Sequence, residues 1–304
     1  MLTVIRSGCK INLYLHVGER LPDGYHSIDS VFLQLEKPYD VLELSSGVGS
    51  HEGIVVSFYD ASEKSPAPLS DISTVSNTLT RAYEWYASQT GFRPRLLLRV
   101  YKGVPRGAGL GGGSANAATL LKYLQSEAGK NGIPELPQDV LLHEARYIGA
   151  DVPFFLRGGL AHVSGIGETM RPLDPVVFSE TLLVACPPVS VSTAWAFGAL
   201  DAVREAGETV FSSRNGLTIE RRHANTSPLA GWKTAGNDFE EIVFGRYPQL
   251  AHLKENLLSC GATLARMSGT GSSVFAFFAD RKIAHEAGKK IAKDGVTVYI
   301  QHTY

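Results

Sequence analysis

The segment GVPRGAGLGGGSANAATLL at 103–121 places a run of glycines directly before an alanine- and leucine-rich stretch. Ordering a glycine costs more backbone entropy than ordering any other residue, so such a run is expected where the backbone itself has a task. Backbone N–H groups at the start of a helix bind anions, because the helix dipole and the unpaired donors both favour negative charge. The segment therefore predicts a loop that holds phosphate groups.

The glycine run does not fit the common nucleotide loops well. GAGLGG at 107–112 matches G-x-G-x-x-G, but Pro105 and Arg106 lengthen a turn that must be tight in a dinucleotide fold. No strand ending in an acidic residue follows at the expected spacing of about 20 positions. A Walker A loop requires a lysine where Gly113 stands. A dehydrogenase remains an alternative that tight NADH binding would support.

The residues after the glycines predict a helix that positions this loop. Ser114 is the expected N-cap, because its hydroxyl can accept a hydrogen bond from a free N–H group in the first turn. A buried stripe at helical spacing is expected from Ala117, Leu120, Leu121 and Leu124. The alternative, a flexible linker, is disfavoured because linkers do not usually end in a capped helix with an apolar face.

Composition limits the kind of partner. The chain has 304 residues, enough for about two domains, and its 44% hydrophobic content can bury a core. The formal net charge of -1 predicts no binding to nucleic acid or to an anionic membrane. The cysteines Cys9, Cys186 and Cys260 are far apart and form no C-x-x-C pair, which argues against a disulfide framework or a zinc site. The composition remains compatible with a small anionic substrate that binds at a local positive site.

The N-terminal residues MLTVIRSGCKINLYL lack the basic and apolar regions of a signal peptide. No uninterrupted apolar stretch reaches the length of about 18 residues that a spanning helix needs. We therefore expect a cytoplasmic protein.

Alternation and helical periodicity predict a mixed first half. Strands are expected at 4–18, 27–35, 40–44, 53–59, 95–100 and 159–165, and helices at 77–89 and 137–155. The helix at 77–89 should bury Leu79, Ala82, Tyr83 and Tyr86.

A change of composition near RPLDP at 171–175 predicts a boundary between domains at 1–172 and 173–304. Beyond it, strands are expected at 180–185, 262–267, 273–279 and 296–301, and helices at 193–205, within 237–258, and at 281–293. Strands and helices segregate rather than alternate, which favours the α+β class. Residues 206–235 are polar and irregular, as in a long surface loop.

PRGAGLGGGSANAA resembles the phosphate-loop motif of the galactokinase, homoserine kinase, mevalonate kinase and phosphomevalonate kinase superfamily, the GHMP kinases. The stretches at 10–32 and 149–168 resemble signatures of its isoprenoid-pathway branch, and the stretch at 267–278 resembles the third motif of the superfamily. The resemblance implies a ribosomal protein S5 domain 2-like ATP-binding domain followed by a ferredoxin-like α/β sandwich domain.

The resemblance also implies a reaction. Kinases of this branch phosphorylate the 2-hydroxyl group of a methylerythritol linked to cytidine diphosphate. Phosphoryl transfer to an alcohol needs a base for the proton and a cation for the developing charge. By resemblance these are Asp151 as general base and Lys10 as its electrostatic partner. Without the motifs, Lys10 would be an ordinary strand lysine and Asp151 a residue of a turn.

Substrate contacts follow from the same resemblance. Tyr25 is expected to stack on the cytosine, His26 to hydrogen-bond its polar edge, and Asn12 to contact the erythritol side. Thr193 is expected near the substrate and Phe197 on the other face of the cytosine. Phe197 could instead be part of a helix core.

For ATP, the resemblance implies the residues Asn77, Lys102, Pro105, Gly107, Gly109, Leu110, Gly111, Gly112, Gly113 and Ser114. Asn77 and Lys102 also have local explanations, as a helix N-cap and a strand end. SGTGSS at 268–273 is expected to close on the substrate through Gly269 and Thr270, and a plain hairpin turn is the alternative. Mg²⁺ is expected with the nucleotide, but no metal ligand is assigned, because Ala115 replaces a serine common in the family.

Two other functions stay open. Another GHMP kinase, acting on homoserine or mevalonate, is disfavoured by DGYH at 23–26, because those acids offer no base to stack on. A non-catalytic, ligand-sensing member is disfavoured because Lys10 and Asp151 are both present. The expected partners are ATP and a small-molecule substrate, and the expected state is a monomer or weak homodimer.

Overall fold

The computed structural model describes residues 2–22, 24–47, 52–61, 67–174, 178–206 and 231–302. They form two compact units, each built from separate segments of the chain. Unit 1 comprises Met1–Cys9, Pro38–Val104 and Gly111–Gly158, and unit 2 comprises Lys10–Lys37, Pro105–Leu110 and Gly159–Tyr304. Strands β1 (Leu2–Arg20) and β2 (His26–Ser46) contribute residues to both. Among the helices in the described ranges, none has the length and apolar character needed to cross a bilayer.

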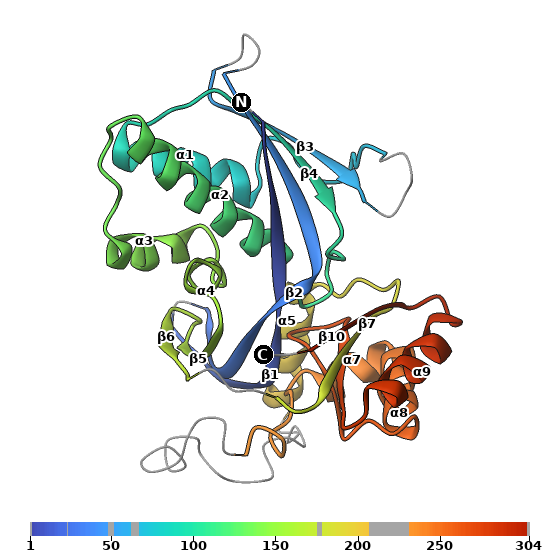
Figure 1. Cartoon of the computed structure of the whole chain (residues 1–304). Coiled ribbons are helices and arrows are strands. Elements are labelled where there is room, and N and C mark those ends of the chain that lie inside the picture. The colour runs from blue at the N-terminus through green and yellow to red at the C-terminus, as the bar shows by residue number, and fades with distance from the viewer. Residues whose placement is uncertain are drawn as a thin grey trace. The chain divides into compact units, whose positions relative to one another are not determined.

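Unit 1 combines part of a six-stranded sheet with helices. Residues 41–46 of β2 pair antiparallel with β4 (Leu96–Lys102), and β4 pairs parallel with β3 (Ile54–Asp60). The helices are α1 (Thr78–Thr90), α2 (Gly112–Lys130), α3 (Gln138–Glu144) and α4 (Val152–Arg157). Helices α1 and α2 run side by side (Figure 1).

The apolar stripes predicted for these helices are confirmed. Helix α1 buries Leu79, Ala82, Tyr83 and Tyr86, and α2 buries Ala117, Leu120, Leu121 and Leu124. Asn77 is the N-cap of α1, and its side chain accepts hydrogen bonds from two N–H groups of the first turn. These stripes hold α2 in place, so the start of α2 has a fixed support.

Two helix predictions in unit 1 are wrong. Helix α2 begins earlier than expected, with Gly111 rather than Ser114 at the N-cap, because Gly111 adopts the left-handed conformation (φ 70°). The predicted helix at 137–155 is divided into α3, a 3₁₀ turn at Ala145–Tyr147, and α4. Pro153 lies in the first turn of α4, where its missing N–H group costs nothing, and it could not sit inside a longer helix.

Unit 2 contains a second sheet with strand order β10-β7-β9-β8. Its strands are β7 (Thr181–Cys186), β8 (Leu264–Met267), β9 (Val274–Phe278) and β10 (Thr297–His302), and all neighbours are antiparallel. Its helices are α5 (Thr193–Glu205), α7 (Glu240–Arg246), α8 (Pro248–Ser259) and α9 (Arg281–Ala292). Residues 28–33 of β2 also pair with β5 (Leu160–Gly165), which pairs with β6 (Thr169–Pro172).

This arrangement is the expected α+β fold, and the sheet has the strand–helix order of a ferredoxin-like sandwich. Helices α8 and α9 pack on the sheet (Figure 1), where Leu257, Ile291 and Phe278 are fully or almost fully buried. A second cluster joins α5 and α7 to the end of β1 through Leu200, Phe239 and Val17. Helix α5 is therefore anchored by its apolar face.

Other expectations differ from the structure or are not tested by it. The strands expected at 27–35 and 40–44 are one strand, β2, and Pro38 lies between its stretch paired with β5 and its stretch paired with β4. Strand β6 occupies part of the predicted boundary segment. Of the loop predicted at 206–235, residues 207–230 lie outside the described residues. The domain boundary after residue 172 stays a prediction.

Candidate active site

The glycine-rich loop is anchored in unit 2 through its carbonyl groups. The oxygens of four consecutive residues accept hydrogen bonds, those of Gly107 from Val191 N (3.0 Å), Ala108 from Ser273 N (3.1 Å), Gly109 from Ser268 Oγ (3.0 Å) and Leu110 from Lys10 N (2.9 Å). These donors come from three separate regions of the chain. The loop is therefore held along one edge by the surrounding backbone.

Gly109 shows why a glycine is needed here. Its φ of 72° lies in the left-handed region, and a Cβ atom at this position would overlap the carbonyl oxygen of Ser268. The loop and the 268–273 segment are thus packed backbone against backbone.

In unit 1 the continuation of the loop starts α2. A Cβ atom on Gly111 would lie 3.3 Å from Oδ2 of Asp151 and 3.0 Å from the Phe155 ring, so the Asp151 carboxylate is beside the helix start. The ammonium nitrogen of Lys102 lies 3.5 Å from the position of the Cβ atom that Gly112 lacks. Ser114 is in the first turn of α2. A carboxylate, an ammonium group and a hydroxyl are therefore gathered around the positive end of one helix.

The N–H groups of this segment contrast with its carbonyl groups. Within the part of the chain that the structure describes, no backbone N–H group from Gly107 to Ser114 donates a hydrogen bond to a protein acceptor. Backbone donors normally find a partner in the protein or in solvent. A row of such donors leading into a helix N-terminus forms an anion-binding backbone.

The junction between β4 and the loop is organised by Asp40, which is fully buried in unit 1. Asp40 pairs with Lys102 and accepts hydrogen bonds from Gly103 N (2.9 Å), Val104 N (2.8 Å) and Asn116 Nδ2 (2.7 Å). The carboxylate thus ties the end of β4 to α2. The sequence analysis did not identify Asp40. A signal was present, because Asp40 stands at an inward-facing position of an alternating strand, where a charged residue is expected to be buried.

In unit 2, Lys10 and Asn12 are brought together on β1 and are both buried. Lys10 Nζ donates to Asn12 Oδ1 (2.5 Å) and lies 4.7 Å from the centre of the Phe32 ring. The backbone N–H group of Asn12 donates to Ser268 Oγ (3.2 Å), and its side-chain amide donates to Ser30 Oγ (3.0 Å). The ammonium group therefore has a fixed position.

The 268–273 segment is the hairpin connection between β8 and β9, and it also supports the glycine-rich loop. Its closure on a substrate stays a prediction. Asn237 Nδ2 donates to the carbonyl groups of Met267 (2.8 Å) and Gly269 (2.7 Å), which fixes the hairpin. The hydroxyl oxygens of Thr270 and Thr193 are 3.2 Å apart. The predicted substrate residues of the hairpin and α5 therefore touch.

The ring side chains expected at the cytosine lie in unit 2. His26 is buried, its ring centre is 5.2 Å from that of Phe197, and its Nε2 atom is 2.6 Å from Asp201 Oδ1. Tyr25 is 63% exposed. Phe197 is partly buried and also packs edge-on against Phe239 at 4.8 Å, so it borders the core and neighbours His26.

Comparison with known proteins agrees with this arrangement. The sequence matches the GHMP kinases N terminal domain over residues 77–159 and the GHMP kinases C terminal domain over residues 219–297. It is 45% identical to a 4-diphosphocytidyl-2-C-methyl-D-erythritol kinase of Nitratidesulfovibrio vulgaris, with 98% of this chain and 97% of the relative covered. The chain belongs to the GHMP kinase family. A kinase of the same name from Solidesulfovibrio magneticus is 38% identical to this GHMP kinase over 98% of the chain and 96% of the relative.

Solved structures share the fold of this GHMP kinase. A 4-(cytidine 5'-diphospho)-2C-methyl-D-erythritol kinase superposes with a TM-score of 0.71 at 26% identity, with 98% of each chain covered. A homoserine kinase from Cytophaga hutchinsonii superposes with a TM-score of 0.65 at 17% identity, covering 99% of this chain and 95% of that chain. The second likeness concerns the fold alone.

The predicted site residues of this GHMP kinase divide between the units. Unit 1 holds Asn77, Lys102, Gly111, Gly112, Gly113, Ser114 and Asp151, and unit 2 holds Lys10, Asn12, Tyr25, His26, Pro105, Gly107, Gly109, Leu110, Thr193, Phe197, Gly269 and Thr270. Asn77 uses its side-chain oxygen for the cap of α1 and its amide nitrogen for the Ser73 carbonyl group (2.9 Å). Sequence reasoning missed the supporting residues Asp40, Asp201, Asn237 and Ser268. Asp201 had a signal, because it follows Phe197 by four residues in a predicted helix.

Proposed function

We propose that this GHMP kinase transfers the γ-phosphate of ATP to the 2-hydroxyl group of 4-diphosphocytidyl-2-C-methyl-D-erythritol, a step of the methylerythritol phosphate route to isoprenoid precursors. The observation that carries the proposal is the row of N–H groups from Gly107 to Ser114, which have no protein acceptor among the described residues. Phosphate oxygens are the acceptors that such a row fits. The full-length similarity to kinases of this name supplies the acceptor alcohol.

The chemistry follows from the groups beside the loop. In phosphoryl transfer the substrate O–H bond breaks, a new O–P bond forms, and the bond between the β- and γ-phosphates of ATP breaks to release ADP. We assign the proton of the 2-hydroxyl group to the Asp151 carboxylate, which lies beside the start of α2. Lys10 would stabilise the negative charge that develops on the transferring group.

Mg²⁺ is part of the proposal as the ion that accompanies ATP. It prefers oxygen ligands and usually binds nucleotide phosphates with one or two carboxylates. The hydroxyl of Ser114 in the first turn of α2 and the Asp151 carboxylate near Gly111 fit this donor set. When bound, the ion would neutralise phosphate charge, and we assign no single residue as its ligand.

The cytidyl group has a proposed site of its own in unit 2. The exposed ring of Tyr25 can stack on a flat base, and Phe197 can cover the other face. His26 would hydrogen-bond the polar edge of the cytosine, and Asn12, Thr193, Gly269 and Thr270 would contact the erythritol side. Such side chains distinguish a cytidyl substrate from small hydroxy acids, which have no base.

Three further statements belong to the proposal. Residues 1–172 and 173–304 are proposed as the ATP-binding and substrate-binding domains. The protein is proposed to act in the cytoplasm, on ATP and a small molecule, with no nucleic acid or membrane partner. Its proposed state is a monomer or weak homodimer.

A coupled ADP-release assay tests the function. The purified protein, with ATP and Mg²⁺, is offered the cytidyl substrate, mevalonate or homoserine in parallel. Of the three alcohols, we expect only the cytidyl substrate to give ADP release above background. Equal or faster turnover of mevalonate or homoserine would overturn the assigned acceptor, and no turnover of any alcohol would overturn the kinase mechanism.

A further inference from the structure

Helix α5 presents side chains at intervals of four residues to the candidate substrate residues of unit 2. Thr193 lies 3.2 Å from Thr270, and Phe197 packs on the ring of His26. Asp201, one turn further along, lies 2.6 Å from the same ring. Because residues four apart share a helix face, Asp201 belongs to the face that carries the two expected substrate residues.

The contact between Asp201 and His26 defines where the imidazole proton lies. An ionised carboxylate can only accept hydrogen bonds, so Nε2 of His26 must donate to Asp201 Oδ1. In a neutral imidazole one nitrogen donates and the other accepts, so Nδ1 is then the acceptor. The side chains are only 4% and 20% exposed, so the protein rather than solvent determines this tautomer.

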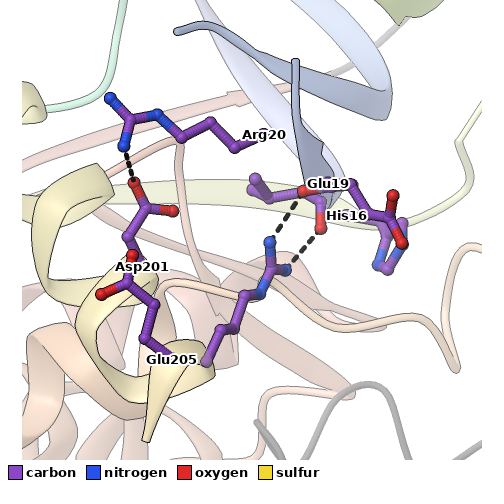
Figure 2. A pocket seen from close by; sticks show the side chains of 8 residues that line it. His16, Glu19, Arg20, Asp201 and Glu205 are labelled. Atoms are coloured by element: carbon purple, nitrogen blue, oxygen red, sulfur yellow. Dashed lines mark hydrogen bonds and ion pairs between the residues drawn. The ribbon is translucent and has the colours of Figure 1, made fainter. Parts of the chain in front are cut away.

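The second oxygen of Asp201 faces a pocket of about 470 Å³ (Figure 2). Arg20 Nη1 lies 3.9 Å from Asp201 Oδ2, and the same wall carries Glu205, one turn further along α5. Arg204 donates to the carbonyl groups of Val17 and Gly18, which holds α5 against the end of β1. Asp201 therefore has one oxygen for His26 and one for Arg20, on a helix that is held in place.

We propose that Asp201 is a positioning residue that keeps the His26 proton on Nε2 and thereby makes Nδ1 an acceptor for the 4-amino group of cytosine. This inference rests on the proposed function, in which His26 recognises the base. Uracil presents a carbonyl oxygen where cytosine has its amino group, and two facing acceptors leave both groups without a hydrogen bond. Asp201 thus selects cytidyl over uridyl substrates without contacting them.

The test compares Asp201→Asn and Asp201→Ala with the full-length wild-type enzyme. Both substitutions permit the other tautomer of His26. The asparagine amide can donate a hydrogen bond to Nε2 as well as accept one, and the alanine side chain can neither donate nor accept. We expect kcat/KM for the cytidyl substrate to fall about tenfold, mainly through KM, with kcat changed less than about twofold. The preference over the matching uridine diphosphate substrate should also fall about tenfold. Glu205→Gln is the control, because it makes the same chemical change in the same pocket and has no contact with His26 within the described chain.

Imidazole ¹⁵N NMR gives a readout that is independent of turnover. Protein with ¹⁵N-labelled histidine should show His26 protonated at Nε2 in the wild type and redistributed towards Nδ1 in Asp201→Ala, with His26→Gln identifying the signals. The inference about Asp201 would be overturned if the wild type is active and both Asp201 variants keep its KM, its base preference and its His26 tautomer. The proposed function would stand in that case. A wild type without turnover of the cytidyl substrate would overturn the proposed function, and the NMR result would still decide whether Asp201 orients His26. If Asp201→Ala does not fold, Asp201→Asn decides the outcome.

Discussion

Unit 1 and unit 2 prepare their candidate site residues by different means. In unit 1 the groups proposed to bind phosphate are backbone N–H groups at the start of α2, which continue the row that begins at Gly107 in unit 2. One buried carboxylate, Asp40, holds the junction between β4 and this segment. In unit 2 the groups are side chains, held by hydrogen bonds between segments far apart in sequence, as Asn12 is held by Ser268. A backbone surface suits phosphates, whose oxygens are alike in every nucleotide. Side chains suit a substrate that must be distinguished from other alcohols.

The two kinds of site are sensitive to different substitutions. A site made of N–H groups fails when the backbone moves, so its sensitive positions are glycines and the residues that anchor the loop. A site made of side chains fails when a single functional group changes. Substitutions in the two units should therefore differ in what they impair, and the substitution of Asp151 should have the greatest effect.

Asp151 is the side chain in unit 1 to which we assign chemistry rather than binding. Asp151→Asn keeps the volume but removes the base, so we expect kcat to fall about a thousandfold with the KM for ATP little changed. ADP release at saturating substrates measures kcat, and the thermal unfolding midpoint checks that the variant is folded. A kcat near that of the wild type would show that Asp151 is not the base.

Asp40→Asn tests the anchor of unit 1. The change leaves the ammonium group of Lys102 without its buried carboxylate, so we expect the free energy of unfolding to fall by about 3 kcal/mol and the KM for ATP to rise. Urea denaturation measures the first quantity. Asp139→Asn, at an exposed site on α3, is the matched control and should change stability by less than about 0.5 kcal/mol. Equal stability of the two variants would show that Asp40 does not anchor the junction between β4 and α2.

Gly109→Ala tests whether the loop depends on backbone packing. The new Cβ atom would overlap the Ser268 carbonyl group and require a left-handed conformation, so we expect a loss of about 2 kcal/mol in unfolding free energy. Gly198→Ala is the control, because Gly198 lies within α5 with open space around it and alanine should stabilise the helix by about 0.5 kcal/mol. Isothermal calorimetry with ATP then shows whether the loop variant also loses nucleotide affinity. Unchanged stability and affinity would contradict the close approach.

The contact between His16 and Asp238 in unit 2 should make the stability of the protein depend on pH. The hydrogen bond between His16 Nδ1 and Asp238 Oδ2 (2.9 Å) raises the pKa of His16, although burial opposes the shift. A raised pKa in the folded state means that the contribution to stability is complete below the unfolded pKa of about 6.5 and is lost as the pH rises through the folded pKa. As the pH rises through the folded pKa of His16, the stability of the wild type should therefore fall relative to the stability of His16→Gln. Urea denaturation midpoints of both proteins, measured across this pH range, test the prediction. Parallel pH profiles of the two proteins would exclude a role for this pair.

Much of the local structure could be predicted from the sequence. Helix α5 has the predicted bounds, Asn77 caps α1, and Lys102 ends β4, because each depends on periodicity or on residues adjacent in the chain. The start of α2 could not be located, since Gly111 caps it through a left-handed conformation that composition alone does not specify. The continuity of β2 was also missed, because Pro38 is tolerated only where the strand changes its pairing partner.

The partners of the supporting residues in the candidate site could not be predicted from the sequence. Asp40, Asp201 and Ser268 act through partners that are distant in sequence, and no local pattern names those partners. Their roles appear once the chain is folded, because a hydrogen bond depends on the positions of both groups.

Residue types and their order were enough to predict the α+β class, the glycine-rich segment with its helix, and the resemblance to the GHMP kinases. These features depend on residue type and on spacing along the chain. The folded chain was needed to show that the loop carbonyl groups accept hydrogen bonds, that Asp40 anchors Lys102, and that Asp201 contacts His26. The physical reason is that burial and hydrogen bonding are properties of pairs of groups, and folding determines which distant groups meet.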